Sequence, residues 1–187
     1  MSAAASVESR DRLRLFCALR LPDLAVEELS RWQAAALGGR DEIRLVAPAH
    51  LHVTLAFLGS RPKDELDAIA GELRAAAESA APARLTLARY RETRSVGMLV
   101  CDDEGGRAVG LATDLHARLE RLGVYERERR PWLPHVTVAR FRRQPRLQPA
   151  LPDLGPFVTS EAAVYMSVLR PSGAQYEVLQ SVALGGS

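Results

Sequence analysis

The sequence contains few cysteines, a single lysine and no long apolar run. Cys17 and Cys101 are the two cysteines among 187 residues, and each lies in its own apolar segment. Two separate cysteines make neither a disulfide framework nor a metal motif, so we interpret them as buried free thiols in a reducing compartment. No apolar stretch is long enough to cross a bilayer, and residues 1–11 lack the apolar centre of a signal peptide. We therefore expect a cytoplasmic protein without membrane contact, in which residues 1–11 are a flexible tail.

Signatures of several common enzyme classes are also missing. The chain has no Gly-x-x-x-x-Gly-Lys phosphate loop, and the pairs Gly38-Gly39 and Gly105-Gly106 do not form one. No segment resembles the Gly-x-Ser-x-Gly turn that carries the nucleophile of a serine hydrolase. These absences argue against ATP, nicotinamide cofactors and a Ser-His-Asp triad.

Length and composition favour one domain. The chain is 47% hydrophobic and 26% charged, which is ordinary for a globular protein, and its length allows one good core. We predict a single domain over residues 12–187. The net charge is only +2, so no overall field attracts nucleic acid.

Positive charge is unevenly distributed. Nearly all of the positive charge is arginine. One cluster lies on both sides of the motif at 135–137: Arg127, Arg129, Arg130, Arg140, Arg142, Arg143 and Arg146. Guanidinium groups bind phosphate bidentately and stack on bases. The cluster is therefore either a rim that attracts phosphate or a solvated basic loop paired with Glu126 and Glu128. The sequence leaves both interpretations open.

Strand-like and helix-like segments alternate along the chain. Apolar, β-branched runs predict strands at 12–20, 43–46, 51–58, 84–91, 96–101, 131–141, 159–169 and 175–184. Apolar residues at helical spacing predict helices after Pro22, over 62–81 and between Gly106 and Gly123. This order fits one α+β domain with two similar lobes, related by pseudo-twofold symmetry, whose central strands face each other across a groove.

The most informative feature is the tripeptide His-Val-Thr, which occurs twice. It spans residues 52–54 and 135–137, each time in an apolar run with a proline four residues before the histidine. Successive side chains of a strand point to opposite faces, so each histidine shares a face with the threonine of its own motif. A single such histidine is usually a packing or surface residue. Two copies with the same spacing and context indicate two equivalent positions with a joint purpose.

Two imidazoles suit a metal-free acid–base reaction at a phosphate ester. In-line displacement at phosphorus requires a base on one side and an acid on the other, and imidazole, with a pKa of ~6.5, serves as either. The threonine hydroxyls can hydrogen-bond the non-bridging oxygens. A metal site would need a third ligand, and neither motif has a cysteine or an acidic cluster beside it. We therefore expect no metal and no cofactor.

The other two histidines are weaker candidates. His50 precedes the first motif and shares the face of His52 only if the strand already begins there, so a substrate contact is the less favoured interpretation. His116 lies among Asp114, Arg118 and Glu120 in the third predicted helix, and we interpret it as a surface residue.

Four segments together resemble the two-histidine (2H) phosphoesterase superfamily, and within it the RNA 2′,3′-cyclic phosphodiesterase (LigT) family, once called 2′-5′ RNA ligases. They are RLFCALRLP near the N-terminus, APAHLHVTLAFLG around the first motif, RPWLPHVTVARF around the second, and SVLRPSGAQYEVL near the C-terminus. The resemblance covers nearly the whole chain. It implies a bilobal α+β fold in which two pseudo-symmetric lobes of antiparallel sheet plus helices surround the groove.

The resemblance also implies an activity, the metal-free hydrolysis of a terminal 2′,3′-cyclic phosphate of RNA or an oligonucleotide to a 2′-phosphomonoester. His52 would donate a proton to the leaving 3′-oxygen, and His135 would activate water. Thr54 and Thr137 would hold the phosphate. Arg140, five residues after the second histidine, would contact it too. Strict alternation places Arg140 on the face opposite His135, so this role requires a bulge or the strand end.

Substrate preference is less clear from the sequence. Phe57 and Tyr176 are candidates for stacking a base and are equally well explained as core residues. The chain departs from the family pattern at Trp132, where phenylalanine is commoner, and at Arg44-Leu45, where a tryptophan is common. These departures bear on the substrate rather than on the reaction. We expect a monomer with no obligate protein partner.

Two other functions remain open. One is a phosphodiesterase for 2′-5′ oligonucleotides or for a small cyclic phosphate. The other is a non-catalytic nucleotide- or RNA-binding module that uses the groove only to hold phosphate. A pure binding module has no need of two titrating groups, which favours an enzyme.

Overall fold

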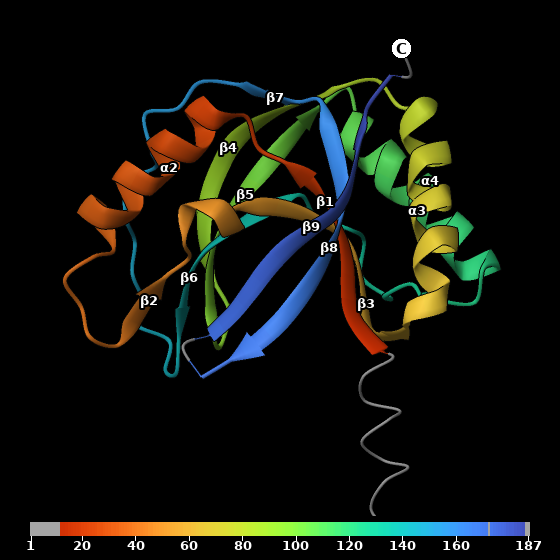
Figure 1. Ribbon diagram of the computed structural model, residues 1–187. Helices are drawn as coiled ribbons and strands as arrows, with labels where there is room; N and C mark the ends of the chain where they lie inside the picture. The colour runs from red at the N-terminus through yellow and green to blue at the C-terminus, as the bar shows by residue number, and fades with distance from the viewer. Residues whose placement is uncertain (1–11, 172, 186–187) are drawn as a thin grey trace, which may run out of the picture.

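One curled antiparallel sheet, with three α-helices packed on one face, makes up the part of the chain that the structure describes (Figure 1). This computed structural model describes residues 12–171 and 173–185, and the tail predicted for residues 1–11 lies outside them. The α-helices are α2 (Asp23–Ala36), α3 (Leu66–Glu78) and α4 (Arg107–Arg121), and two short 3-10 turns are η1 (Pro48–His50) and η2 (Lys63–Glu65). No helix within these ranges has the length and apolar character that spanning a bilayer requires.

The sheet has the strand order β7-β4-β5-β6-β3-β1-β8-β9, and β2 pairs with the end of β6. The strands are β1 (Arg12–Arg20), β2 (Ile43–Leu45), β3 (His52–Pro62), β4 (Ala83–Glu92), β5 (Val96–Glu104), β6 (His135–Phe141), β7 (Phe157–Thr159), β8 (Glu161–Arg170) and β9 (Gly173–Ala183). Most lie within a few residues of their predicted places. β3 is longer than predicted because it pairs with β1 along its whole length, from His52 to Pro62.

The two predicted lobes are the two halves of this single sheet. One half has the order β6-β5-β4-β7 and the other β3-β1-β8-β9, so each half places its His-Val-Thr strand innermost. The halves join where β3 pairs with β6, antiparallel, at Val53 and Val136. The motif strands therefore lie side by side rather than across a groove from each other. This adjacency is what brings the two motifs together.

The three helices bury their apolar stripes against the same face of the sheet. Leu29 of α2, Leu73 of α3 and Leu115 of α4 are at most 1% exposed and belong to one cluster with Leu19 and Val53 of the strands. Burying each such side chain stabilises the fold by about 1.5–3 kcal/mol. The opposite face of β3 and β6 is left for the histidines and threonines, since their neighbours Val53 and Val136 point into the core.

Both cysteines are buried and free, as predicted. Burial raises the pKa of the Cys17 thiol to about 12, and burial together with the nearby Asp102 does the same for Cys101. Both thiols therefore remain protonated near neutral pH and behave as small apolar core groups.

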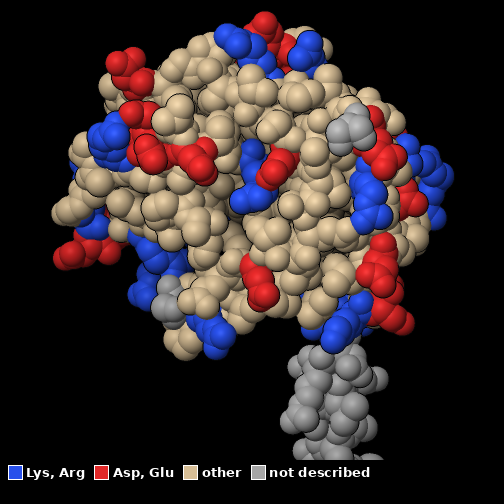
Figure 2. Space-filling model, turned by 45° about the horizontal axis from the view of Figure 1, so that its top comes forward, with Lys and Arg blue, Asp and Glu red and all other residues tan. Residues whose placement is uncertain are grey.

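The arginines around the second motif differ in their surroundings. Arg127 pairs with Glu120 at 3.3 Å and Arg130 pairs with Glu128 at 2.9 Å, so these arginines belong to a solvated, charge-paired loop. On the face shown in Figure 2, acidic and basic side chains are likewise interspersed. Arg140 differs, because it lines a groove on the sheet.

Candidate active site

A groove of about 610 Å³ lies on the sheet face opposite the helices. His52, Thr54 and Thr137 lie in it, together with Arg140, and its walls come from β1, β2, β3, β6, β8 and β9. The lining stops short of His135, which is half-buried at the start of β6. The groove therefore brings together side chains from both halves of the sheet.

The strand register sets the arrangement of the four motif side chains. Because Val53 pairs with Val136 in an antiparallel ladder, the next positions place His52 opposite Thr137 and Thr54 opposite His135. Directly opposed residues have Cβ atoms about 4.5–5.5 Å apart and diagonal ones about 7–8 Å apart. The two histidines are therefore a diagonal pair across the two strands.

Both imidazoles are anchored in the same way. Nδ1 of His52 lies 2.7 Å from the carbonyl oxygen of His50, and Nδ1 of His135 lies 2.8 Å from that of Leu133. A carbonyl only accepts, so each Nδ1 carries the proton and donates it. Nε2 is therefore the atom that accepts or gives up a proton. Nε2 of His52 lies 3.1 Å from the Thr54 hydroxyl, which donates to it when the ring is neutral.

The surroundings of His52 favour its neutral form. Burial lowers its pKa to about 4, although the bond to the His50 carbonyl raises it and the charges of His135, His50 and Arg140 lower it further. Aromatic rings supply the burial: the ring centroids of Phe16, Tyr176 and Tyr165 lie 4.9, 5.5 and 5.8 Å from that of His52. In the free protein His52 is therefore neutral at pH 7.

Each motif strand has a β-bulge at the third residue after its histidine. In β3 the pairing with β1 skips Leu55, and in β6 the pairing with β5 skips Val138. An extra residue shifts the alternation of side chains by one. The bulge turns Arg140 into the groove despite its spacing from His135. Phe57, at the corresponding position of β3, also lies in the groove and is 50% exposed.

Both bulges are held by a buried polar side chain from a helix. Nε2 of His116, on α4, donates to the carbonyl of Leu55 at 2.7 Å. Nε2 of Gln33, on α2, donates to the carbonyl of Val138 at 2.5 Å and to that of Val46 at 3.1 Å. The two donors thus occupy equivalent places behind the two motifs, on the core side of the sheet.

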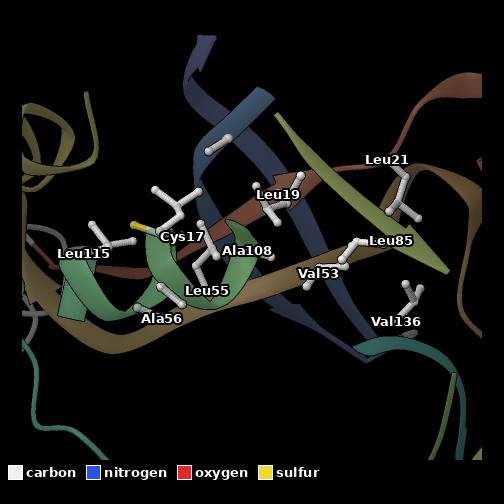
Figure 3. Close-up of a cluster of buried hydrophobic side chains, with 14 of the residues drawn as sticks. Cys17, Leu19, Leu21, Val53, Leu55, Ala56, Leu85, Ala108, Leu115 and Val136 are labelled. Atoms are coloured by element: carbon white, nitrogen blue, oxygen red, sulfur yellow. The ribbon is translucent and has the colours of Figure 1, made fainter. Parts of the chain in front are cut away.

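The prediction that His116 is a surface residue is wrong, since it is 5% exposed. It continues the buried stripe of α4 that includes Ala108, Ala112 and Leu115. Figure 3 shows Ala108 and Leu115 of this stripe packed beside Leu55 and other core side chains. The charged neighbours of His116 in sequence point elsewhere, and the helical spacing of its apolar neighbours was the better signal.

The two aromatic candidates both lie in the groove. Phe57 is an exposed groove residue, with the guanidinium carbon of Arg14 4.8 Å above its ring. Tyr176 packs edge-on against Phe16, at a centroid distance of 5.0 Å, and beside His50. Neither is a residue of the main core.

Sequence reasoning missed several groove residues. Arg14, Arg44 and Arg170 line it, and only Arg44 had drawn attention, as a departure from a family pattern. His50 lines it as well, and its Nε2 accepts the backbone N–H of Tyr176 at 3.3 Å. Alternation along β1 indicates Arg14 and Phe16 together, but the sequence does not say that this face meets the motif strands.

Trp132 connects the segment of the second motif to the first motif. Its indole N–H donates to the carbonyl of Thr54 at 3.0 Å, so the loop before β6 is fastened to β3. Over residues 12–171 and 173–185 no three His, Cys, Asp or Glu side chains converge as a metal site requires. Metal independence itself stays a prediction.

Comparison with known proteins identifies the family. The family model of the 2′-5′ RNA ligase superfamily matches residues 21–171. An RNA 2′,3′-cyclic phosphodiesterase of Thermus thermophilus is 35% identical, over 93% of this chain and 91% of that protein. One of Methanocaldococcus jannaschii is 25% identical, over 90% of this chain and 99% of that protein.

Solved structures show the same fold. E. coli LigT complexed with 3′-AMP has a TM-score of 0.79 and is 26% identical, with 92% of this chain and 98% of that chain covered. The resemblance noted in the two histidine segments is thus confirmed, and the chain belongs to the 2′-5′ RNA ligase superfamily of two-histidine phosphoesterases.

Proposed function

We propose that the protein hydrolyses a terminal 2′,3′-cyclic phosphate of RNA to a 2′-phosphomonoester by metal-free, two-histidine acid–base catalysis. The observation that carries this proposal is the pair of imidazoles on adjacent antiparallel strands, both anchored through Nδ1. The names of the two relatives, RNA 2′,3′-cyclic phosphodiesterase, support the substrate.

The reaction requires one base and one acid. His135 accepts a proton from water at Nε2 while the water oxygen forms a bond to phosphorus. His52, protonated at Nε2, gives that proton to the 3′-oxygen as the P–O3′ bond breaks. The product keeps the phosphate on the 2′-oxygen. His135 then loses its extra proton to solvent and His52 takes one up, which restores the starting state.

The acid role of His52 requires that substrate binding change its protonation. Its pKa of about 4 leaves the ring neutral in the free protein at pH 7. An opposite charge within about 4–6 Å raises such a pKa by about 1–3 units. The anionic cyclic phosphate beside Nε2 therefore raises the pKa of His52 towards the neutral range and favours the protonated ring. The acid is then charged only when substrate is present.

The remaining polar groups stabilise the phosphate. Thr54 and Thr137 face the space between the rings, and their hydroxyls donate to the non-bridging oxygens. Arg140, turned into the groove by the bulge, offers a fixed positive charge to the same oxygens. Groups placed where charge grows during reaction contribute most to the rate.

Phosphorus NMR of the product tests the proposal. Incubation of an oligonucleotide with a 2′,3′-cyclic end in excess EDTA should give the 2′-phosphate alone, because the acid lies on one side of phosphorus only. The rate should be bell-shaped in pH, with limbs that belong to the histidine pair. Loss of turnover in EDTA with recovery on adding zinc or manganese contradicts the metal-free mechanism. A 3′-phosphate product reverses the assigned acid and base.

Binding without turnover would instead identify the non-catalytic module. Such a module would consume no cyclic substrate. It would also bind a 3′-phosphorylated oligonucleotide with the same affinity as a His52→Ala, His135→Ala double variant does. Equal hydrolysis of small cyclic phosphates unrelated to nucleotides would favour the broader phosphodiesterase.

A further inference from the structure

We infer that Arg44 and Arg170 form a second phosphate subsite, which binds a backbone phosphate of the nucleic acid next to the nucleotide that reacts. This inference rests on the proposed function, because it names the part of the substrate that the rest of the groove takes. It makes the end of a chain, rather than a cyclic mononucleotide, the preferred substrate.

The groove carries more positive charge than one phosphate requires. Four arginines line it, Arg14, Arg44, Arg140 and Arg170, and its described lining residues include no aspartate or glutamate. The reacting cyclic phosphate carries a single negative charge, which Arg140 and a protonated His52 already balance. Guanidinium groups gathered without carboxylates in a groove favour a polyanion.

Two of these arginines are held directly opposite each other. In the pairing of β2 with β6, Arg44 is the partner of Arg140. Both side chains are exposed, and both line the groove. The pairing therefore brings two guanidinium groups to the same end of the groove, and such groups bind phosphate oxygens through charge-assisted hydrogen bonds.

The tip of the β8–β9 hairpin closes the groove beside this pair. Gly173, with φ +120°, lies against Arg44, and a Cβ at Gly173 would be 2.5 Å from Nη1 of Arg44. Arg170 is the cross-strand partner of Gly173 in the hairpin. The missing side chain at Gly173 thus makes room for the guanidinium of Arg44, and Arg170 lines the same groove from the paired strand. In Figure 1 the hairpin tip lies beside β2 and the end of β6.

Figure 2 places a group of positive side chains at this corner of the molecule. The corner lies at a suitable distance from the reacting phosphate. Along β6, Thr137 lies beside His52 and Arg140 follows three residues later, about 10 Å of strand. That is the scale of one or two nucleotide steps in an extended single strand.

At the other end of the groove Arg14 covers the ring of Phe57, so it is engaged with an aromatic surface.

Three substrates separate this subsite from the reaction centre. They are adenosine 2′,3′-cyclic phosphate with a free 5′-hydroxyl, the same nucleotide with a 5′-phosphate, and a dinucleotide that ends in a 2′,3′-cyclic phosphate. We expect the wild-type protein to have the higher kcat/KM for the two substrates with a second phosphate. A higher kcat/KM for the dinucleotide alone means that the subsite binds an internal phosphodiester. An equal increase for both substrates means that it binds an internal phosphodiester or a 5′-phosphate alike.

Arg44→Gln and Arg170→Gln should each remove this preference. We expect KM for the dinucleotide to rise by roughly 10- to 100-fold, the range for losing charge-assisted hydrogen bonds. The kcat and KM for the free nucleoside cyclic phosphate should stay as in the wild type. The slope of log KM against log salt for the dinucleotide should fall by about 1.

Arg121→Gln is the matched control, since Arg121 is exposed at the end of α4, on the face away from the groove. It loses the same charge and should change none of these values. Arg170→Gln guards against a structural effect, because Arg44→Gln also alters the contact with Gly173. Thermal melts of all three variants check the fold.

Several outcomes overturn the subsite. A wild-type protein indifferent to the second phosphate, or variants that lose activity equally on all three substrates, would contradict it while the proposed function stands. If no substrate is hydrolysed, the proposed function fails, and binding decides the subsite. Adenosine 3′,5′-bisphosphate should then bind more tightly than 3′-AMP to the wild type and equally to Arg170→Gln. Equal wild-type affinities would exclude the subsite.

Discussion

The two halves of the sheet share a backbone plan and differ in the side chains around it. In both, a His-Val-Thr strand is innermost, Nδ1 donates to a carbonyl two residues earlier, and a bulge follows three residues after the histidine. Around His52 are aromatic rings, whereas β6 carries Arg140 opposite Arg44. The pseudo-symmetry positions two equal groups, and their surroundings make them unequal.

This inequality suits a reaction that needs two different roles. An acid and a base made from the same residue must differ in environment, since identical sites would titrate alike. Burial among aromatic rings keeps His52 neutral in the free protein at pH 7. On the other half, β6 and β2 carry the opposed pair Arg140 and Arg44.

The largest effect is expected from removing either imidazole. His52→Ala and His135→Ala should each lower kcat by about 10²–10⁴, the usual range for general acid or base catalysis. Because both act in one step, the double variant should fall little below the worse single one. Steady-state kinetics on a cyclic-ended oligonucleotide, with circular dichroism to check folding, provides the measurement. Near-normal activity in either single variant would remove that residue from the mechanism.

The burial of His52 should make the fold sensitive to acid. Its folded pKa of about 4 lies below the unfolded value of about 6.5, so the unfolded chain takes up the proton first. Stability is therefore fully present above pH 6.5 and is lost as the pH falls toward 4. The loss is about 3 kcal/mol on this shift, from 1.36 kcal/mol per unit. Urea unfolding across this range measures it.

Replacing each motif histidine by glutamine shows which of the two causes the loss of stability in acid. His52→Gln removes the buried titrating group, so its stability should fall less over the same pH range. His135→Gln leaves His52 in place and should retain the loss. Equal acid sensitivity of the wild type and His52→Gln would show that burial of His52 does not control it.

The helix donors behind the bulges should matter next. His116→Leu and Gln33→Leu each leave a buried carbonyl without that donor, at a cost of about 1–3 kcal/mol of stability. The carbonyl of Val138 also accepts the backbone N–H of Val46 at 3.0 Å. The stability lost for each carbonyl should therefore be smaller in Gln33→Leu than in His116→Leu. Chemical denaturation measures both.

Imidazole ¹⁵N spectra show whether each donor serves its own motif. His116→Leu should shift the signals of His52 more than those of His135, and Gln33→Leu should do the opposite, because each donor holds the bulge of one strand. His116→Gln is the matched conservative variant, since its amide can donate to Leu55 in place of Nε2. Equal shifts of both histidines in either variant would contradict this division.

The smallest effect is expected at Phe57. Phe57→Leu keeps an apolar side chain but loses the ring under Arg14, an exposed cation–π contact worth about 0.5–1 kcal/mol. KM for the oligonucleotide should rise a few-fold with kcat unchanged. Leu24→Ala, an exposed apolar residue on α2 outside the groove, is the control. An unchanged KM would return Phe57 to a purely structural role.

Much of the site followed from local sequence patterns. The repeated motif identified His52, His135, Thr54 and Thr137, and strand alternation showed that each pair shares a face, because side-chain direction in a strand depends only on position. Apolar spacing located the strands, the helices and the two buried thiols. The resemblance of four segments to one superfamily agreed with the family match.

Other features depended on contacts that no local pattern contains. The direction of Arg140 and Phe57 is set by bulges, which arise from how β3 and β6 register against β1 and β5. The lowered pKa of His52 comes from rings supplied by β1, β8 and β9. His116 was misassigned because its charged neighbours in sequence point away from the core side that it occupies.

The sequence by itself determined the two motifs, the face each presents and the class of reaction, since residue identity and the two-residue period of a strand are local properties. The tertiary structure alone decided that the motif strands are neighbours, that the pKa of His52 is lowered, and which arginines share the groove. Those depend on strand register and packing between segments more than a hundred residues apart, as in the bond from Gln33 to Val138. Pairing of such distant segments is selected by the whole core, not by any one stretch of chain.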